Sequence, residues 1–367
     1  MVINLKSQTD LSGFYIFYNG STNLERKGIY GISHLGEHLM CKAYEHLQDE
    51  FERKGISWNA YTSSNEVVFY FTGLDEYLSP YRDVVLNLLN NFMPTEEQFI
   101  NEKRIVLEEY KDSFNDQMSS HYLNLSRKLF NDFDPIGERG DLENMTYQDM
   151  VDYVNLQYHR PTKIINVSKH SEYTTDSEFT PRDVDREIKF GNYAVPYELG
   201  NEFKDKTSLI MLSPIIESDY SYITFICEML SGGLQSPLYQ EVREKRGLTY
   251  GIYCNISRIC KKGLIAISVL TSNSKVDEVI DTVKLVIDNP DTYLTQERFD
   301  IVREGMIVRK KKGDINRYNS VSRWLNPIEW DVYDILDTLT LDKVKEVYNK
   351  HFDFNKMYIS NDKKEFQ

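Results

Sequence analysis

The sequence contains little cysteine: four residues in a chain of 367. Cys41, Cys227, Cys254 and Cys260 are spread along the chain, and no two of them form a Cys-x-x-Cys pair. The absence of this pairing favours free thiols in a reducing compartment over a disulfide framework.

The sequence also lacks long apolar runs. No stretch approaches the length that a membrane-spanning helix needs. The first ten residues, MVINLKSQTD, show no basic segment followed by an apolar core, so we expect no signal peptide. These two absences favour a cytoplasmic protein with no membrane association.

Basic residues are in the minority. Asp and Glu number 57 against 43 Lys and Arg, which gives a formal net charge of -14. This balance argues against non-specific binding to nucleic acid or to an anionic membrane surface, and it fits a protein that accepts basic ligands.

Two stretches of the chain resemble each other. Residues 146–158 begin with a Thr suited to N-capping, continue with helical spacing of apolar residues, and precede an apolar strand at 163–168. Residues 340–352 and 356–360 repeat this pattern. In each half of the chain, apolar strands and long amphipathic helices precede this closing unit, which indicates two copies of one α/β domain.

The length agrees with two domains. Between the copies lies a polar stretch with two prolines and two glycines and little periodicity, typical of a linker. We therefore predict a first domain at residues 1–171, a linker at 172–206 and a second domain at 207–367.

Local patterns give the expected elements of the first half. Residues 32–51 have helical spacing, and residues 56–74 read as a hairpin around a polar turn at 63–66. A helix is expected at 75–92. Thr95 and Gln98 have capping-box form and open a further helix that runs to about residue 114.

In the second half, a helix is expected at residues 220–230, ending at a Gly-Gly pair. Ser236 and Pro237 should then start a short helix, with Ser236 as its cap. Two strands, at 248–259 and 263–271, should follow it.

The chemistry of the chain is carried by His34-Leu-Gly-Glu37-His38. On a helix, residues three and four apart share a face, so both imidazoles and the carboxylate point the same way. Two imidazoles from one helical turn can bind zinc, and a carboxylate beside the metal's water can take its proton. The five residues spell the inverted zinc-peptidase motif.

A third ligand should come from another element. The helix after Thr95 offers Glu102, Glu108 and Glu109. Glu102 and Glu109 are seven apart and share a face, whereas Glu108 lies about 100° round the helix. Spacing alone does not decide between a ligand and a solvated acidic face.

At this point the sequence resembles the pitrilysin, insulinase and mitochondrial processing peptidase family over nearly its whole length. The matching segments are Gly31-Ile-Ser-His34-Leu-Gly-Glu37-His38-Leu-Met, Asn59-Ala-Tyr-Thr62, Glu102-Lys-Arg-Ile-Val-Leu-Glu-Glu109, Asp134-Pro-Ile-Gly137, Gly232-Gly233 and Ser236-Pro-Leu-Tyr-Gln-Glu-Val-Arg243-Glu-Lys-Arg-Gly-Leu-Thr-Tyr250.

The resemblance implies an α+β fold of two homologous α/β domains, each a mainly antiparallel sheet packed with helices, as in processing-peptidase-like metallohydrolases. It implies one Zn²⁺ per chain, held by His34, His38 and Glu109, with Glu37 as the general base. Glu102 would orient a ligand.

The resemblance also assigns substrate-binding residues. Asn59 and Ala60 would lie on an edge strand to which an extended peptide adds. Arg243 and Tyr250 would grip the substrate near the scissile carbonyl. Because the chain holds only two of the family's domains, we expect a homodimer in which the partner's Arg243 and Tyr250 complete each zinc site.

One departure from the family is Gly36, which stands where a bulky apolar residue is usual and costs a helix about 1 kcal/mol relative to alanine. The interval from His38 to Glu109 is also shorter than the family norm. No catalytic group is missing. The second half has no His-x-x-Glu-His and should be non-catalytic.

The leading interpretation is a zinc endopeptidase acting on short or unfolded peptides. A second is a catalytically silent scaffold or peptide-binding subunit of the same family. A third is a non-proteolytic zinc enzyme with the same inverted motif, such as a small lyase. Two full halves and the Arg243 and Tyr250 pair favour a peptide substrate over the third.

Overall fold

A computed structural model describes residues 1–7, 9–63, 66–130, 134–181, 205–259, 262–316 and 332–363. The chain forms two compact units. Unit 1 comprises Met1–Ser113 and Ser126–Pro196, and unit 2 comprises Phe114–Leu125 and Tyr197–Gln367. Most of the predicted linker, residues 182–204, lies outside the described residues.

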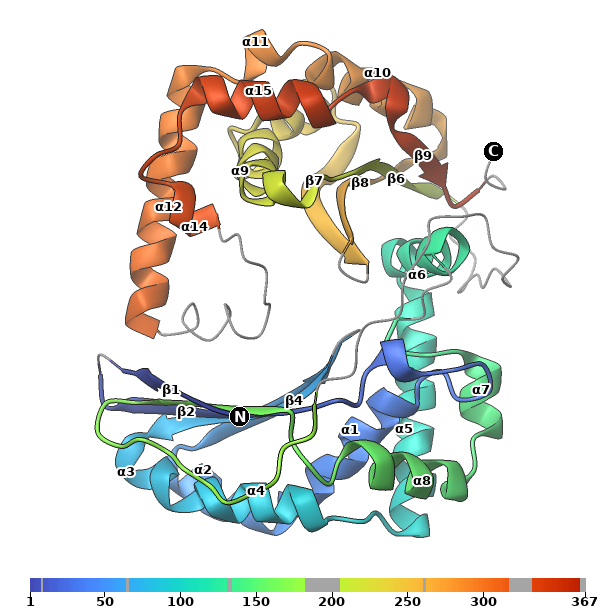
Figure 1. Ribbon diagram of the computed structural model, residues 1–367. Helices are drawn as coiled ribbons and strands as arrows, with labels where there is room; N and C mark the ends of the chain where they lie inside the picture. Colours follow the sequence, from blue (N-terminus) through green and yellow to red (C-terminus); the bar gives the residue numbers. More distant parts are fainter. Residues whose placement is uncertain are drawn as a thin grey trace. The chain divides into compact units, whose positions relative to one another are not determined.

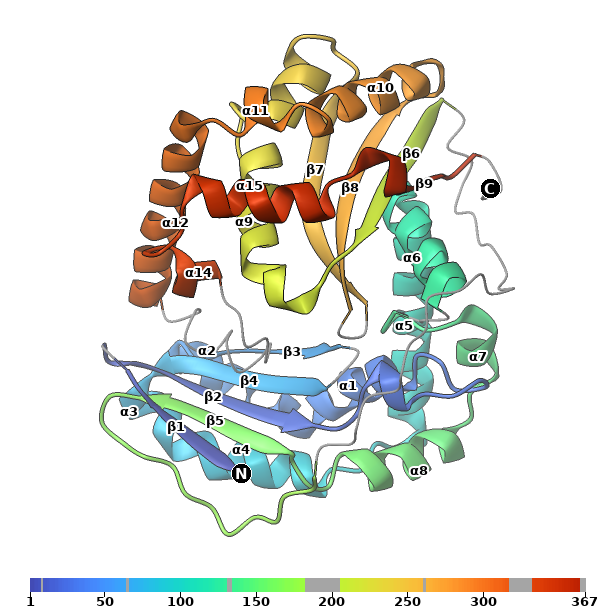
Figure 2. The same ribbon diagram turned by 45° about the horizontal axis from the view of Figure 1, so that its top comes forward.

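Unit 1 is built on a five-stranded sheet of order β1-β5-β2-β4-β3 (Figures 1 and 2). The pairs β2–β4, β3–β4 and β2–β5 are antiparallel, and only the β1–β5 pair is parallel. The strands are β1 (Val2–Lys6), β2 (Leu11–Tyr18), β3 (Ser57–Thr62), β4 (Val67–Leu74) and β5 (Lys163–Ser168). The predicted hairpin is thus confirmed as β3 and β4, with β3 at the edge of the sheet.

Helices α2, α3 and α4 lie along one face of this sheet (Figure 1). The helices of unit 1 are α1 (Ile32–Met40), α2 (Gln48–Lys54), α3 (Asp75–Leu78), α4 (Arg82–Asn91), α5 (Glu96–Asn115), α7 (Arg139–Asn144) and α8 (Tyr147–Gln157); α6 (Gln117–Phe130) continues from α5.

Two predicted helices are interrupted. A 3-10 segment, Cys41–Leu47, separates α1 from α2, and Tyr44 within it has a non-helical φ of -118°. Tyr44 is fully buried, and its ring meets Trp58 and Phe71 edge-on at 4.8 and 5.2 Å. This aromatic packing accounts for the local departure from helix. A second 3-10 turn, Ser79–Tyr81, contains Pro80 and separates α3 from α4.

The predicted caps of α5 and α8 are present. Thr95 and Gln98 exchange the two hydrogen bonds of a capping box, at 2.9 and 3.2 Å. Thr146 and Asp149 form a second capping box at the start of α8. The capping box at Thr95 fixes where α5 begins. The rotation of α5 about its axis then decides which of its acidic residues can reach α1.

Unit 2 repeats the plan of unit 1. Its sheet has the order β7-β8-β6-β9, all antiparallel, from β6 (Lys206–Pro214), β7 (Thr249–Ile259), β8 (Lys262–Ser272) and β9 (Tyr358–Asn361). Taking β9, β6, β8 and β7 as counterparts of β5, β2, β4 and β3, the order is the same in both units. This agreement confirms the predicted fold class of two related α/β domains.

The helices of unit 2 are α9 (Tyr220–Ser231), α10 (Val276–Ile287), α11 (Pro290–Tyr293), α12 (Gln296–Asn316), α14 (Val332–Ile335) and α15 (Leu341–His351). The predicted helix after Ser236 begins at Pro237, as expected, and continues as a π-helical turn, Tyr239–Glu244. The carbonyl of Ser236 accepts the N–H of Gln240 at 2.9 Å. The predicted cap by the side chain of Ser236 was wrong, because its hydroxyl is buried and accepts no hydrogen bond within the described chain.

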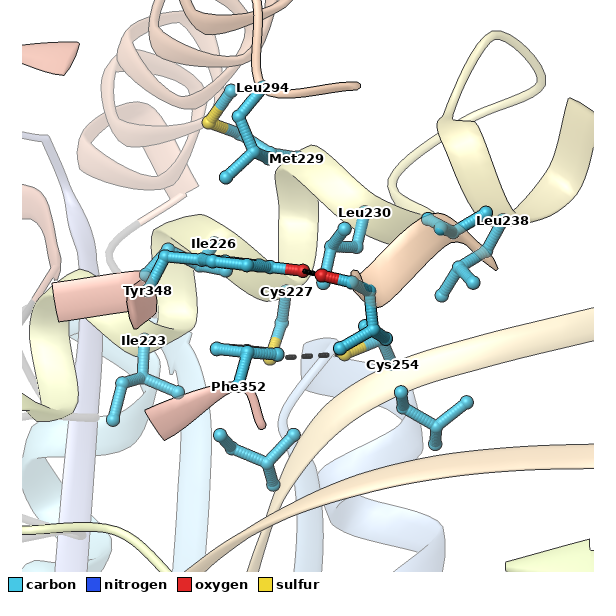
Figure 3. Close-up of a cluster of buried hydrophobic side chains, with 14 of the residues drawn as sticks. Ile223, Ile226, Cys227, Met229, Leu230, Leu238, Cys254, Leu294, Tyr348 and Phe352 are labelled. Atoms are coloured by element: carbon cyan, nitrogen blue, oxygen red, sulfur yellow. Dashed lines mark hydrogen bonds between the residues drawn. The ribbon is translucent and has the colours of Figure 1, made fainter. Parts of the chain in front are cut away.

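The core of unit 2 lies between α9, α15 and the sheet (Figure 3). Within it the hydroxyl of Tyr348 donates to the carbonyl of Ile287 at 2.8 Å. The thiols of Cys227 and Cys254 are 3.4 Å apart and are not joined by a disulfide. Across the described helices, none combines the length and apolar character that crossing a bilayer would need.

The first half of α6 is anchored in unit 2 by a fully buried histidine. His121 contacts the hydroxyl of Ser208 through Nδ1 at 3.0 Å and that of Ser360 through Nε2 at 2.8 Å. Burial lowers the pKa of His121 to about 4. The folded protein therefore holds this imidazole neutral, whereas the unfolded chain takes up a proton near pH 6.5.

We predict that unit 2 loses stability as the pH falls from about 6.5 to about 4, because the unfolded state binds more protons over this window. The loss from His121 amounts to at most about 3 kcal/mol. His121→Gln should flatten this part of the pH profile, as measured by urea unfolding. His46→Gln, at an exposed histidine, is the control. Parallel profiles for wild type and His121→Gln would contradict the prediction.

Candidate active site

Helix α1 begins at a glycine and carries both histidines of the motif. Gly31, at its N-terminus, has a φ of 97°, which a side chain would strain. The rings of His34 and His38 lie 4.7 Å apart, nearly perpendicular, on one side of the helix. The predicted sharing of a face is confirmed for these two residues.

A buried carboxylate holds the start of α1 in place. Glu25 accepts the backbone N–H groups of Gly31 and Ser33, both at 2.9 Å, one at each of its oxygens. These are free donors at the first turn of a helix, where an anion is favoured. Burial raises the pKa of Glu25 to about 7, while the hydrogen bonds oppose that rise. Sequence reasoning did not single out Glu25.

Glu109 on α5 meets both histidines. Its Oε2 lies 3.6 Å from Nε2 of His34 and 3.6 Å from Nε2 of His38. These separations are too long for good hydrogen bonds. Two ligands at about 2.0–2.1 Å from one tetrahedral zinc ion stand about 3.4 Å apart, so the spacing fits atoms that share a metal.

The donor set fits zinc in its chemistry as well. Two imidazoles and one carboxylate are ligands that zinc accepts, and three protein ligands leave a position for water or substrate. Among the residues that the structure describes, His34, His38 and Glu109 are the one group of three or more His, Cys, Asp or Glu side chains with such spacing.

The protonation of the histidines suits a metal ligand. Burial, with a smaller contribution from His38, lowers the pKa of His34 to about 4, so that its imidazole is neutral at pH 7. His38 Nδ1 lies 3.3 Å from Oε2 of Glu102. A carboxylate there can accept only from a protonated Nδ1, which leaves Nε2 free to bind a metal.

The structure separates the three acidic residues of α5. Glu102 is buried beside His38, and its other oxygen pairs with Lys42 at 3.0 Å. Glu108 points away from the histidines and pairs with Lys111 at 2.6 Å. Only Glu109 reaches both imidazoles. Lys42, four residues after His38, was not identified from the sequence.

Glu37 lies on the same helix and is 9% exposed. Its Oε2 accepts a hydrogen bond from the hydroxyl of Thr62 at 2.7 Å. Burial raises the pKa of Glu37, while hydrogen bonds from Thr62 and the neighbouring His38 oppose the rise. A carboxyl whose pKa is moved upward by burial is better matched to proton transfer near neutral pH.

Packing against a tyrosine ring explains why residue 36 is a glycine. A Cβ atom on this residue would come within 3.1 Å of the ring of Tyr158. That ring also donates its hydroxyl hydrogen to the carbonyl of Ser33 at 3.1 Å. Tyr158 therefore occupies the space that a side chain on residue 36 would need.

Asn59 and Ala60 lie on β3, which pairs only with β4 among the described strands. The side chain of Asn59 accepts the N–H of Ala60 at 2.9 Å. The structure thus places both residues on an edge strand, as the sequence led us to expect.

Arg243 and Tyr250 belong to unit 2 and contact each other. The guanidinium of Arg243 lies 4.6 Å from the ring centre of Tyr250 and 4.6 Å from that of Tyr239. Tyr250 is 84% exposed. Tyr239 precedes Arg243 by four residues on a π-helical turn, a form frequent at functional sites. Its position four residues before Arg243 could have identified Tyr239 from the sequence, but we did not single it out there.

Comparisons with known proteins agree with the fold. Residues 6–133 match the family described as insulinase (peptidase family M16), and residues 144–306 match the one described as peptidase M16 inactive domain. A crystal structure of a protease from Helicobacter pylori superposes with a TM-score of 0.79 at 15% identity and covers 98% of this chain and 96% of that one.

Curated relatives carry related names. An uncharacterized zinc protease of Rickettsia felis is 23% identical over 353 residues, covering 88% of this chain and 85% of the relative. A probable mitochondrial-processing peptidase subunit beta of Arabidopsis thaliana is 25% identical over 182 residues, covering 46% of this chain and 34% of the relative.

We predict that the purified protein binds one zinc ion. His34→Ala and Glu109→Gln should each weaken zinc binding by more than about 100-fold, because loss of a residue that only hydrogen-bonds to a metal ligand already costs about 10–100-fold. Metal content after dialysis measures this. Glu108→Gln is the matched control and should keep its zinc. Full zinc in Glu109→Gln together with loss in Glu108→Gln would show that the neighbouring carboxylate is the ligand.

Proposed function

The chain belongs to the insulinase family of peptidases, family M16, and from this premise we propose that it is a zinc-dependent endopeptidase that hydrolyses short or unfolded peptides. One observation carries the proposal: Nε2 of His34 and of His38 both face Oε2 of Glu109 at metal-ligand spacing, with Glu37 on the same helix. The relatives named zinc proteases support the choice of metal.

His34, His38 and Glu109 would hold the zinc ion, and Glu102 would fix His38 in the tautomer that binds it. When bound, zinc would polarise the scissile carbonyl and make a water molecule acidic. Glu37 would accept the proton of the attacking water and then deliver it to the leaving amine. The burial of Glu37 raises its pKa and so makes its carboxylate a stronger base toward the proton of that water.

Substrate would bind in extended form along β3. An edge strand offers unpaired backbone groups to an added peptide, and this mode tolerates many side-chain sequences. Asn59 and Ala60 lie on that strand. Arg243 and Tyr250 would grip the substrate near the reacting bond, and the rings on both sides of Arg243 would hold its guanidinium ready.

A catalytically silent scaffold or peptide-binding subunit is the second candidate. The description of an inactive domain for residues 144–306 favours it. Those residues carry no His-x-x-Glu-His, however, and the complete motif lies outside them. Incubation with casein and a peptide library, read by mass spectrometry, separates a peptidase from a protein that only binds.

We predict that Glu37→Gln keeps its zinc and its unfolding temperature but cleaves peptides about 10²- to 10⁴-fold more slowly, because an amide of nearly the same shape cannot accept the proton. Peptide cleavage, zinc content and thermal unfolding are measured on the same preparation. Cleavage close to the wild-type rate would remove Glu37 from the role of base.

The assembly proposed is a homodimer whose two-fold contact supplies Arg243 and Tyr250 of one copy to the zinc site of the other. A site completed in this way would be enclosed and would exclude folded proteins. Support comes from the count of domains: the chain holds one copy with the motif and one copy with the Arg243 and Tyr250 pair.

Mixing two inactive proteins tests this arrangement. After exchange of subunits between Glu37→Gln and Arg243→Ala, a mixed dimer has one site with both groups intact. We expect activity to return to about a quarter of the wild-type rate per chain under random pairing. Verified exchange without recovery, or a fully active monomer in sedimentation-matched assays, would contradict completion by the partner.

A further inference from the structure

Thr62 joins the substrate strand to the base. It is the last residue of β3, and its hydroxyl donates to Oε2 of Glu37 at 2.7 Å. This is a short, charge-assisted hydrogen bond to a largely buried carboxylate. A carboxylate accepts at both oxygens, so Oε1 of Glu37 keeps the capacity to accept from water.

The hydroxyl of Thr62 has a well-defined position. Thr62 pairs with Val67 at the end of the β3–β4 ladder. The next residue, Ser63, closes the hairpin through its N–H to the carbonyl of Glu66 at 3.0 Å, and its carbonyl accepts the N–H of Thr22 at 3.4 Å. Threonine is also branched at Cβ, which restricts its first torsion angle.

Glu37, by contrast, is a flexible side chain on a helix. Its carboxylate can turn about several bonds, and the orientation of a base decides whether it meets the proton that it should accept. The hydroxyl of Thr62 contacts Oε2 of Glu37 directly, at 2.7 Å. This hydrogen bond therefore acts on the group whose orientation decides proton transfer, the carboxylate of Glu37.

We propose that Thr62 is the positioning residue for Glu37, holding one carboxylate oxygen so that the other faces the attacking water. The same strand carries Asn59 and Ala60, so a peptide that adds to β3 would also steady the group that positions the base. This inference rests on the proposed peptidase function. It assigns a role to a side chain that otherwise only ends a strand.

The test compares three substitutions. Thr62→Val keeps the shape and removes the hydroxyl, and Thr62→Ser keeps the hydroxyl. Thr72→Val is the matched control: it lies on the neighbouring β4, where its hydroxyl reaches the carbonyl of Ser57 at 3.5 Å and not Glu37. Each protein is measured for kcat, KM, zinc content and thermal unfolding.

Thr62→Val should lower kcat about tenfold or more, with KM and zinc content unchanged, since a hydrogen bond to a charged group is lost. Thr62→Ser and Thr72→Val should stay within about twofold of wild type. Equal effects of Thr62→Val and Thr72→Val, or failure of Thr62→Ser to restore kcat, would overturn the inference in favour of a general need for packing in the sheet.

A double substitution tests whether Thr62 acts through Glu37. In the Glu37→Gln background, Thr62→Val should cause little further loss, because the group that it positions is already disabled. An additive loss of the full factor would place the action of Thr62 elsewhere and overturn the inference.

Crystal structures of the metal-free wild type and of Thr62→Val give a readout that does not depend on turnover. We expect the carboxylate of Glu37 to leave its observed position in the variant, and an unchanged position would overturn the inference. If wild type cleaves no peptide while Glu37 moves in the variant, the peptidase proposal fails and the positioning stands.

Discussion

The site depends on one geometric constraint: two helices far apart in sequence must bring donor atoms to a single point. Three imidazole or carboxylate atoms within 4.8 Å of one another tolerate little movement of α1 against α5. The start of α1 is therefore fixed by backbone contacts. Glu25 binds its first free N–H groups. A Cβ on Gly137 would stand 2.4 Å from the Cα of Gly31, so that only glycine allows this approach. The geometry of the proposed metal ligands therefore depends on contacts at the start of α1, made by residues that come both before and after them in the chain.

Unit 2 contains a corresponding pair of helices but no His-x-x-Glu-His. In chain order, α9 follows β6 as α1 follows β2, and α12 follows the helices after β8 as α5 follows those after β4. Arg298 on α12 donates to the carbonyls of Glu228 and Met229 at 2.9 Å and also to that of Gly232, thereby satisfying the C-terminal end of α9. A buried arginine thus joins the two helices of unit 2. In unit 1, α1 and α5 instead bring the donor atoms of His34, His38 and Glu109 together.

Much of this could be predicted from sequence where the relevant forces are local. The spacing of His34, Glu37 and His38, and the helix caps at Thr95 and Thr146, depend on neighbours within a turn or two. Contacts made by distant parts of the chain could not be predicted. The bond from Thr62 to Glu37 needs the register of β3, and the choice of Glu109 over its neighbours needs the rotation of α5. Ser236 shows the converse: it precedes a helix and is a good capping residue in sequence, yet its buried hydroxyl accepts no hydrogen bond within the described chain.

The aromatic pair around Arg243 bears on why the second copy is kept. A guanidinium between two rings 4.6 Å away loses little freedom on meeting a ligand, because its orientation is already set. Tyr239 and Arg243 lie four residues apart on a π-helical turn. A helix distortion costs stability and persists where geometry requires it. Tyr250 remains 84% exposed despite its ring size, which leaves one aromatic face available. These features support the proposed role of Arg243 and Tyr250 in gripping substrate, on a copy of the fold that has no His-x-x-Glu-His of its own.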